Sequence, residues 1–123
     1  MIQFYNVQFY NQGSTSYSTS NGLFNVSGGW APGTSVNEII AKGVPMNKIV
    51  VGKAATLADA DSVSYMTATA LNSAFIAAYN HNKWSAGVMF WQYSSDNNGA
   101  ILSTAISGLM NAITSNKDKN LII

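Results

Sequence analysis

Three short stretches of the chain are dominated by apolar residues and predict β-strands. The first runs from Ile2 to Tyr10, the second from Lys48 to Gly52, and the third from Ala86 to Tyr93. Short, nearly continuous apolar runs are typical of strands that are covered on both faces, as they are in parallel sheets.

Helical patterns separate these stretches and follow the last of them. Thr34-Ser35 can cap a short helix that Gly43 ends, and a second helix begins at Thr67. A third begins at Asp96 or Asn97. Strands and helices therefore alternate, which predicts right-handed βα units, a parallel sheet and an α/β fold class. At 123 residues the chain fits one domain, residues 1–123.

Polar and aromatic side chains gather at the carboxyl ends of two predicted strands. Gln8 and Tyr10 share one face of the first strand, and Asn11 follows them; Met89 and Trp91 share one face of the third. The alternate positions are apolar and suit packing against helices: Val7, Phe9, Val88 and Phe90. Because parallel α/β proteins collect their functional groups at the carboxyl ends of strands, the polar faces predict a barrel interior or a crevice there.

The composition excludes several classes of function. Only 9% of the residues are charged, against roughly 25% in ordinary soluble domains. The net charge is +1 and the chain has no Arg, which does not suit binding to nucleic acid or to a membrane surface. One His and no Cys leave no metal-ligand spacing and no disulfide. No metal or other cofactor is expected.

The two ends of the sequence are unusual. The chain opens inside a predicted strand, without the basic n-region of a signal peptide, so we expect a piece of a longer protein. The last residues, Asn120 to Ile123, predict a further apolar, strand-like segment that could pair with an edge of the sheet.

Three segments carry a resemblance to a known family. They are VQFYNQ at residues 7–12, KIVVGKAAT at 48–56 and GVMFWQYSSD at 87–96. In this order and spacing they resemble the last three βα units of the family 18 glycoside hydrolases, the chitinases and their relatives. The resemblance covers essentially the whole chain and implies strands six, seven and eight of a (β/α)8 TIM barrel. A full barrel takes about 250 residues, so the chain would be its C-terminal portion.

The resemblance also implies roles at the strand ends. Tyr10 would hydrogen-bond the N-acetyl group of the substrate, and Gln8 and Asn11 would line the same cleft. Trp91 would form the floor under the sugar that is cleaved, with Met89 beside it. In this family the acetamido oxygen of the substrate attacks the anomeric carbon, so the protein holds that group rather than supplying a nucleophile.

One departure from the family is decisive. The catalytic signature Asp-x-x-Asp-x-Asp-x-Glu is absent, and the only Glu, Glu38, lies in a predicted helix. Ala54 and Ser64 stand where relatives often have Pro and Gly. The resemblance thus implies either the C-terminal piece of a chitinase, inactive alone, or a non-catalytic protein that binds chito-oligosaccharides or acts as a scaffold.

The expected partners follow from these two alternatives. They are chitin or chito-oligosaccharides, together with either the complementary N-terminal barrel segment or further copies of the chain that pair through open sheet edges. The parent protein of a chitinase piece would be secreted.

Several other residues have both a functional and a structural interpretation. Trp30 either reaches the rim of the cleft or packs within its own loop. Asp59 and Asp61 look like a solvated loop pair rather than ligand contacts. Asp96 fits a helix cap better than a catalytic acid, and His81 lies at a helix end near the start of a strand, the structural face of a barrel.

Overall fold

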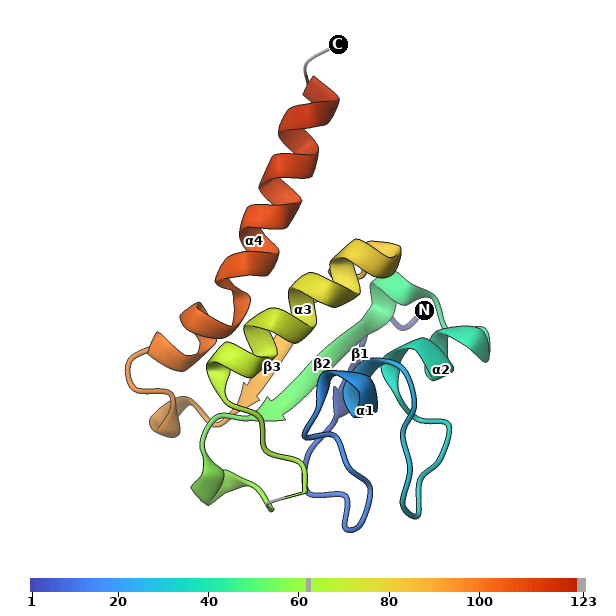
Figure 1. Ribbon diagram of the computed structural model, residues 1–123, viewed down its shortest axis with the longest axis vertical. Coiled ribbons are helices and arrows are strands. Elements are labelled where there is room, and N and C mark those ends of the chain that lie inside the picture. Colours follow the sequence, from blue (N-terminus) through green and yellow to red (C-terminus); the bar gives the residue numbers. More distant parts are fainter. Residues whose placement is uncertain (62, 122–123) are drawn as a thin grey trace.

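The computed structural model describes residues 1–61 and 63–121 and forms a three-stranded parallel sheet in the order β1-β2-β3 (Figure 1). The strands are β1 (Tyr5–Gln8), β2 (Ile49–Ala54) and β3 (Val88–Trp91). Val51 in the central strand stands opposite Val7 on one side and Val88 on the other. The α/β fold class and the parallel sheet predicted from the sequence are confirmed.

The strand limits differ from those predicted. The first predicted strand is too long at both ends, because β1 pairs with β2 only from Tyr5 to Gln8. The third is also shorter than predicted. The second continues past Gly52, because Lys53 and Ala54 still stand opposite residues of β3.

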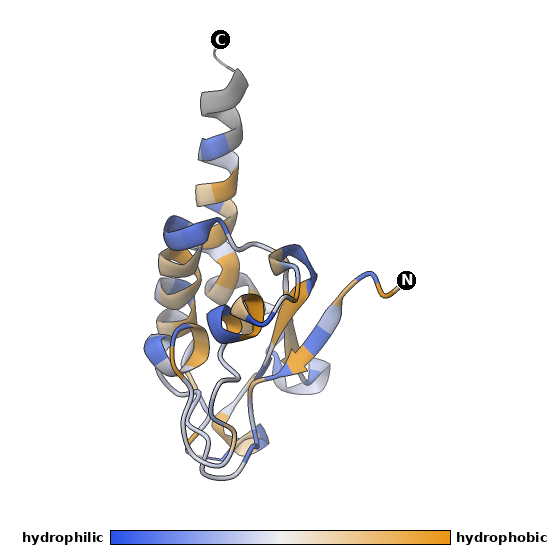
Figure 2. Cartoon of the chain, turned by 90° about the vertical axis from the view of Figure 1, so that its right-hand side faces the viewer, coloured by the Kyte–Doolittle hydropathy of each residue, from blue (hydrophilic) through white to orange (hydrophobic). Residues whose placement is uncertain are grey.

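The α-helices gather on one side of the sheet, as the side view in Figure 2 shows. They are α1 (Ser20–Phe24), α2 (Val36–Ala41), α3 (Ala68–Asn82) and α4 (Ala100–Leu121). Short 3₁₀ helices also occur: η1 (Met46–Lys48), η2 (Leu57–Asp59) and η3 (Tyr93–Ser95). The parallel strands follow one another across the sheet in chain order. The two connections between them have the same handedness, so both cross the same face of the sheet. Among the described residues, no α-helix covers the other face.

Two helices begin where the sequence predicts. Ser35 caps α2 in a capping box with Glu38, and Thr67 caps α3 by accepting from the N–H of Ala70. The Glu38 carboxylate also accepts from the N–H of Ser27 at 2.8 Å. Together these hydrogen bonds lower the pKa of Glu38 to about 2, and the bond from the Ser27 backbone contributes most.

Helix α1 was not predicted, because the segment before it is small and polar and reads as a loop. Thr19 caps this helix through the N–H of Gly22 at 3.0 Å, and its apolar residues Leu23 and Phe24 are buried. A single turn has too few residues to show a helical period.

The start of α4 agrees only in part with the prediction. The helix begins at Ala100, a few residues after the predicted Asp96 or Asn97. The Asp96 carboxylate nevertheless accepts from the N–H of Leu102 at 3.0 Å, so it satisfies a first-turn donor as a helix cap does.

The prediction of a strand-like segment from Asn120 to Ile123 is wrong for the two of these residues that the structure describes. Asn120 and Leu121 continue α4, which rises beyond the body of the molecule in Figure 1. Ile122 and Ile123 lie outside the described residues.

The core lies between the sheet and the helices. Phe24, Phe75 and Trp84 form an aromatic cluster with ring centroids 5.2, 5.7 and 6.1 Å apart. The Trp84 indole N–H donates to the carbonyl of Ile49 at 2.9 Å, so this buried side chain has its polar group satisfied. The cluster joins α1 and α3 to the start of β2.

Helices α3 and α4 pack closely at Gly108. Its N–H donates to Oδ1 of Asn72 at 2.8 Å, and a Cβ at this position would clash with Ile76. The small residue therefore permits the close approach of the two helices.

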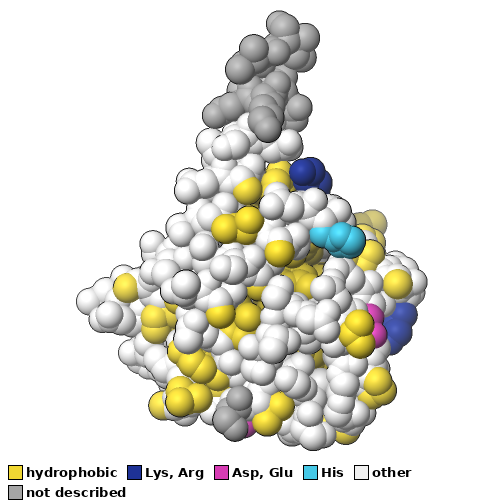
Figure 3. Space-filling view, in the orientation of Figure 1, with side chains coloured by type: hydrophobic (Ala, Val, Ile, Leu, Met, Phe, Trp, Pro, Cys, Tyr) yellow, Lys and Arg dark blue, Asp and Glu magenta, His cyan; other side chains and the backbone are white. Residues whose placement is uncertain are grey.

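The helix side of the molecule carries few charges (Figure 3). Most of its surface is uncharged, as the low content of charged residues predicts. Among the described residues, no helix combines the length and the hydropathy that crossing a membrane requires.

Candidate functional site

The two faces of the sheet differ as the alternation of side chains predicts. Phe9 and Val51 are buried beneath the helices, with Val88 packed against the same core. On the other face Gln8 is exposed and Trp91 is 51% exposed, although both lie in strands. The predicted assignment of apolar positions to the helix side is confirmed.

Gly52 occupies the middle of the uncovered face. A Cβ there would lie 2.8 Å from the Val7 carbonyl oxygen, 3.0 Å from Cε of Met89 and 3.3 Å from Oδ1 of Asn6. The side chains of Met89 and Asn6 therefore converge above this glycine. Ala54, opposite Trp91, is also small, so the central strand leaves room between its neighbours.

A hollow of about 590 Å³ lies on this face towards the amino ends of the strands. It is lined by Gln3, Phe4, Asn6, Asn47, Val50, Ala86, Gly87, Val88 and Met89. Of the residues predicted to contact sugar, only Met89 reaches it.

Tyr10 lies just beyond the end of β1 and is only 6% exposed. Its carbonyl accepts from Nε2 of Gln8 at 3.0 Å and from Nε2 of Gln12 at 3.4 Å. Burial, and secondly the carboxylate of Asp59, raise the pKa of the Tyr10 phenol, so it stays protonated and able to donate. The Gln8 side chain thus holds the Tyr10 backbone.

Asn11 joins the end of β1 to the β2–α3 loop. Its backbone N–H donates to Oγ of Ser64 at 3.0 Å, and its Nδ2 donates to the Asp59 carbonyl at 3.0 Å. Its Oδ1 accepts from the N–H of Asp61 at 2.7 Å. Both polar atoms of the Asn11 carboxamide thus form hydrogen bonds within the protein, and these bonds hold the β2–α3 loop against the end of β1.

Asp59 and Asp61 are partly exposed in their loop, and both carboxylates also form hydrogen bonds within it. Oδ2 of Asp59 accepts from the hydroxyl of Thr56 at 2.8 Å, and Oδ1 of Asp61 accepts from that of Ser64 at 2.6 Å. Their loop therefore lies against the end of β1, with the Asp59 carboxylate in the surroundings of Tyr10.

Lys53 is the residue that sequence reasoning missed. It is 0% exposed, and its ammonium donates to the carbonyls of Phe9 at 2.9 Å, Tyr17 at 2.9 Å and Ser64 at 2.5 Å. Burial lowers its pKa to about 7, and the carboxylate of Asp61 opposes this shift. The signal available in the sequence was a Lys two positions after Val51, on the core face of an apolar strand.

Trp30 contacts the loop that follows β1 rather than packing only within its own loop. It lies in the α1–α2 loop, where its indole N–H donates to the carbonyl of Gln12 and its ring lies beside Gly13. It is nevertheless 64% exposed. The indole is fixed against the loop that follows β1 and still offers a free aromatic surface.

Two other residues discussed from the sequence, Trp91 and His81, lie on elements other than the end of β1 that holds Tyr10 and Asn11. The peptide bond between Trp91 and Gln92 is cis. Trp91 ends β3 on the far side of the central strand, where its carbonyl accepts from the N–H of Ala55 at 2.6 Å. His81 lies on α3, as predicted, and lines a hollow between helices.

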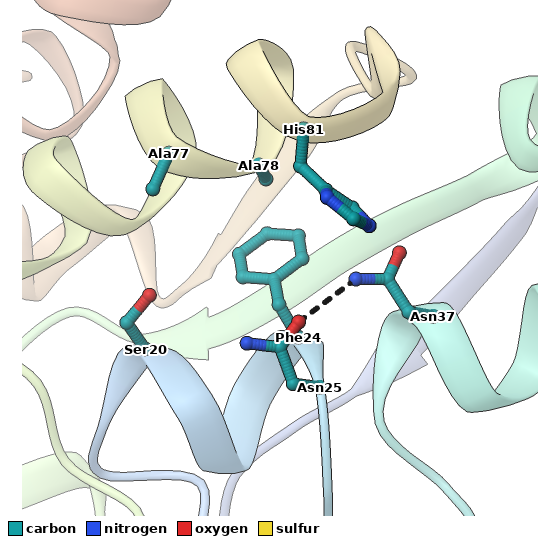
Figure 4. A pocket seen from close by; sticks show the side chains of 7 residues that line it. All are labelled: Ser20, Phe24, Asn25, Asn37, Ala77, Ala78 and His81. Atoms are coloured by element: carbon teal, nitrogen blue, oxygen red, sulfur yellow. Dashed lines mark hydrogen bonds between the residues drawn. The ribbon is translucent and has the colours of Figure 1, made fainter.

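That second hollow, of about 240 Å³, lies among α1, α2 and α3 (Figure 4). Phe24 points into it, and Nδ2 of Asn37 donates to Oδ1 of Asn25 at 3.1 Å across its wall. Oδ1 of Asn37 accepts in turn from Asn82 at 2.9 Å. These carboxamides bind one another and tie the three helices together.

Among the side chains that the structure describes, no group of His, Cys, Asp or Glu could hold a metal ion. The chain matches no family model, no curated protein and no solved structure.

Proposed function

We propose that the chain is the C-terminal portion of a chitinase-like glycoside hydrolase. It supplies the acetamide-holding Tyr10 and the aromatic floor Trp91 of a cleft for β-1,4-linked N-acetylglucosamine polymers. The observation that carries this proposal is the sheet face that no described α-helix covers, on which Gln8 and Trp91 stand exposed at the ends of parallel strands.

The winding of the chain supports a barrel. Strands β1, β2 and β3 follow one another in one direction, and the α-helices gather on one face. An open doubly wound sheet reverses its strand order and carries helices on both faces. A segment of a (β/α)8 barrel has helices outside and an inner face that neighbouring strands complete, so strands six to eight fit this arrangement.

The chemistry of the two aromatic residues fits a substrate-assisted reaction. The Tyr10 hydroxyl, like any unperturbed tyrosine hydroxyl, is protonated at neutral pH, and burial raises its pKa further, so it can donate to the acetamido group while that group attacks the anomeric carbon. Trp91, half-exposed at the end of β3, offers a flat apolar surface for a sugar ring.

The general acid is not part of this chain. Glu38, the only Glu, is held in the capping box of α2 with its pKa lowered to about 2, whereas a glycosidase acid needs a raised pKa. This favours a second candidate function, a non-catalytic protein that binds chito-oligosaccharides. In either case we expect the complementary barrel segment or further copies of the chain to cover the open sheet edges.

Sugar binding and hydrolysis by the full chain test the proposal. We expect the chain to bind an N-acetylglucosamine tetramer, measured by calorimetry or NMR, and not to cleave a fluorogenic chito-oligosaccharide. Tyr10→Phe and Trp91→Ala should each weaken binding. Tyr79→Phe is the matched control, because Tyr79 is also 6% exposed but lies on α3.

Two outcomes would contradict the proposal. Absence of tetramer binding would overturn both candidate functions. Cleavage by the chain alone that is sensitive to Tyr10→Phe would show that the acid lies within the chain after all.

Association of the chain is a separate expectation. Phe4 and Trp91 are exposed on the uncovered face, and both edge strands have unpaired backbone groups. Light scattering at micromolar concentration should therefore detect oligomers of the isolated chain. A dispersed monomer with cooperative melting would refute this expectation.

A further inference from the structure

Lys53 is a buried ammonium whose hydrogen bonds all go to backbone carbonyls. An ammonium has three N–H donors, and Lys53 uses each of them on a different segment. Phe9 directly follows β1, Tyr17 lies in the β1–α1 loop, and Ser64 lies in the β2–α3 loop. None of these bonds belongs to a helix or to the sheet.

Burying a charge in this position is costly. Lys53 lies on the core face of β2, two residues after Val51, and an apolar side chain of similar length would fill the space without desolvating a charge. What an apolar side chain cannot do is join three loop segments at one point.

Two of these segments lead directly to the candidate sugar site. The carbonyl of Phe9 belongs to the peptide group that connects it to Tyr10. Ser64 accepts from the N–H of Asn11, and Asn11 in turn holds Asp59 in the same loop. Lys53 is therefore linked to the Tyr10 backbone through the Phe9 peptide group, and to Asp59 through Ser64 and Asn11, while its own side chain is sealed from solvent.

We propose that Lys53 is a positioning residue for the sugar site: its ammonium fixes the end of β1 and the β2–α3 loop so that Tyr10 meets the acetamido group. This inference rests on the proposed function. It assigns no contact between Lys53 and the substrate.

A comparison of two buried substitutions on β2 tests the role. Lys53→Met keeps the length and removes the donors, whereas Val51→Ala makes a cavity in the same strand and leaves the three hydrogen bonds intact. Below about pH 7, where Lys53 carries its proton, and at a temperature where both variants are folded, Lys53→Met should weaken binding of the N-acetylglucosamine tetramer about tenfold. Val51→Ala should leave the affinity close to that of the wild type.

Hydrogen exchange gives a second measurement on the same variants. Lys53→Met should speed exchange of the Asn11 amide, which donates to Ser64, by about tenfold or more relative to Val51→Ala. Equal exchange and equal affinity in the two variants would reduce Lys53 to an ordinary core residue and overturn the inference.

The wild-type protein provides a test if Lys53→Met does not fold. The ¹⁵Nζ resonance of Lys53 should shift when the tetramer binds. That of Lys48, whose ammonium donates to the carbonyl of Ile2 at 2.9 Å before the start of β1, should not. A bound tetramer that leaves the Lys53 resonance unchanged would overturn the positioning role alone, whereas absence of binding would overturn the proposed function and this inference with it.

Discussion

The stability of the folded chain should increase with pH above neutrality because of Lys53. Its pKa is lowered from 10.5 to about 7 on folding, so between these values the unfolded chain binds the extra proton and the folded chain does not. The free energy of unfolding therefore rises with pH across this window, and the gain is lost as the pH falls towards 7.

The size of the effect follows from the two pKa values and the hydrogen bonds of Lys53. Between about pH 7 and about pH 9 the shift alone would add about 2 kcal/mol to the free energy of unfolding. The three carbonyl acceptors favour the ammonium and act against this gain, so we expect an increase of about 1 to about 2 kcal/mol.

Urea unfolding followed by far-UV circular dichroism at several pH values measures this increase. The protein concentration must stay fixed, because association adds to apparent stability. Lys53→Met should abolish the increase, and Lys48→Met should preserve it, since Lys48 is partly exposed at the opposite end of the sheet. A flat profile in the wild type, or the same rise in Lys53→Met, would refute the assignment to Lys53.

Three further predictions concern stability. Below about pH 4 the free energy of unfolding should fall more steeply in the wild type than in Glu38→Gln. The pKa of Glu38 is lowered on folding, so its stabilisation is lost as the carboxylate is protonated. Parallel acid profiles of the two proteins would contradict this. Gly52→Ala should destabilise the chain by about 1 to 3 kcal/mol in urea melts, whereas Gly28→Ala, with open space around it, should change little. Gly108→Ala should lower the melting temperature, since the clash with Ile76 outweighs the gain of about 1 kcal/mol in helix propensity; a higher melting temperature would show that the helices can move apart.

The parts of the fold that the sequence predicted have local signals. Ser35 and Thr67 cap their helices through contacts three residues away, and the three strands are apolar runs that can be read from neighbouring residues. Helix α1 has a cap at Thr19 but only a single turn, so no periodic pattern separates it from a loop.

The candidate site depends on contacts that the sequence does not reveal. The family resemblance and the place of Asn11 after the first strand predict a residue that lines the cleft, whereas the sequence gives no sign that its side chain bonds partners 48 and 50 residues along the chain. Lys53 was read as the residue after a strand, and the carbonyls that it joins are 11, 36 and 44 residues away. The positions of Tyr10 and Trp91 were suggested by alternation within their strands, which is local.

The hydrogen bonds of Lys53 have a consequence for how this sequence can diverge. Every amino acid has a backbone carbonyl, so Phe9, Tyr17 and Ser64 can each be replaced without removing the acceptor that binds the ammonium. Lys53 itself has no substitute with three donors on one flexible stem. In descendants of this chain we therefore expect an invariant Lys surrounded by variable partners, a pattern in which pairwise covariation would detect none of the three contacts.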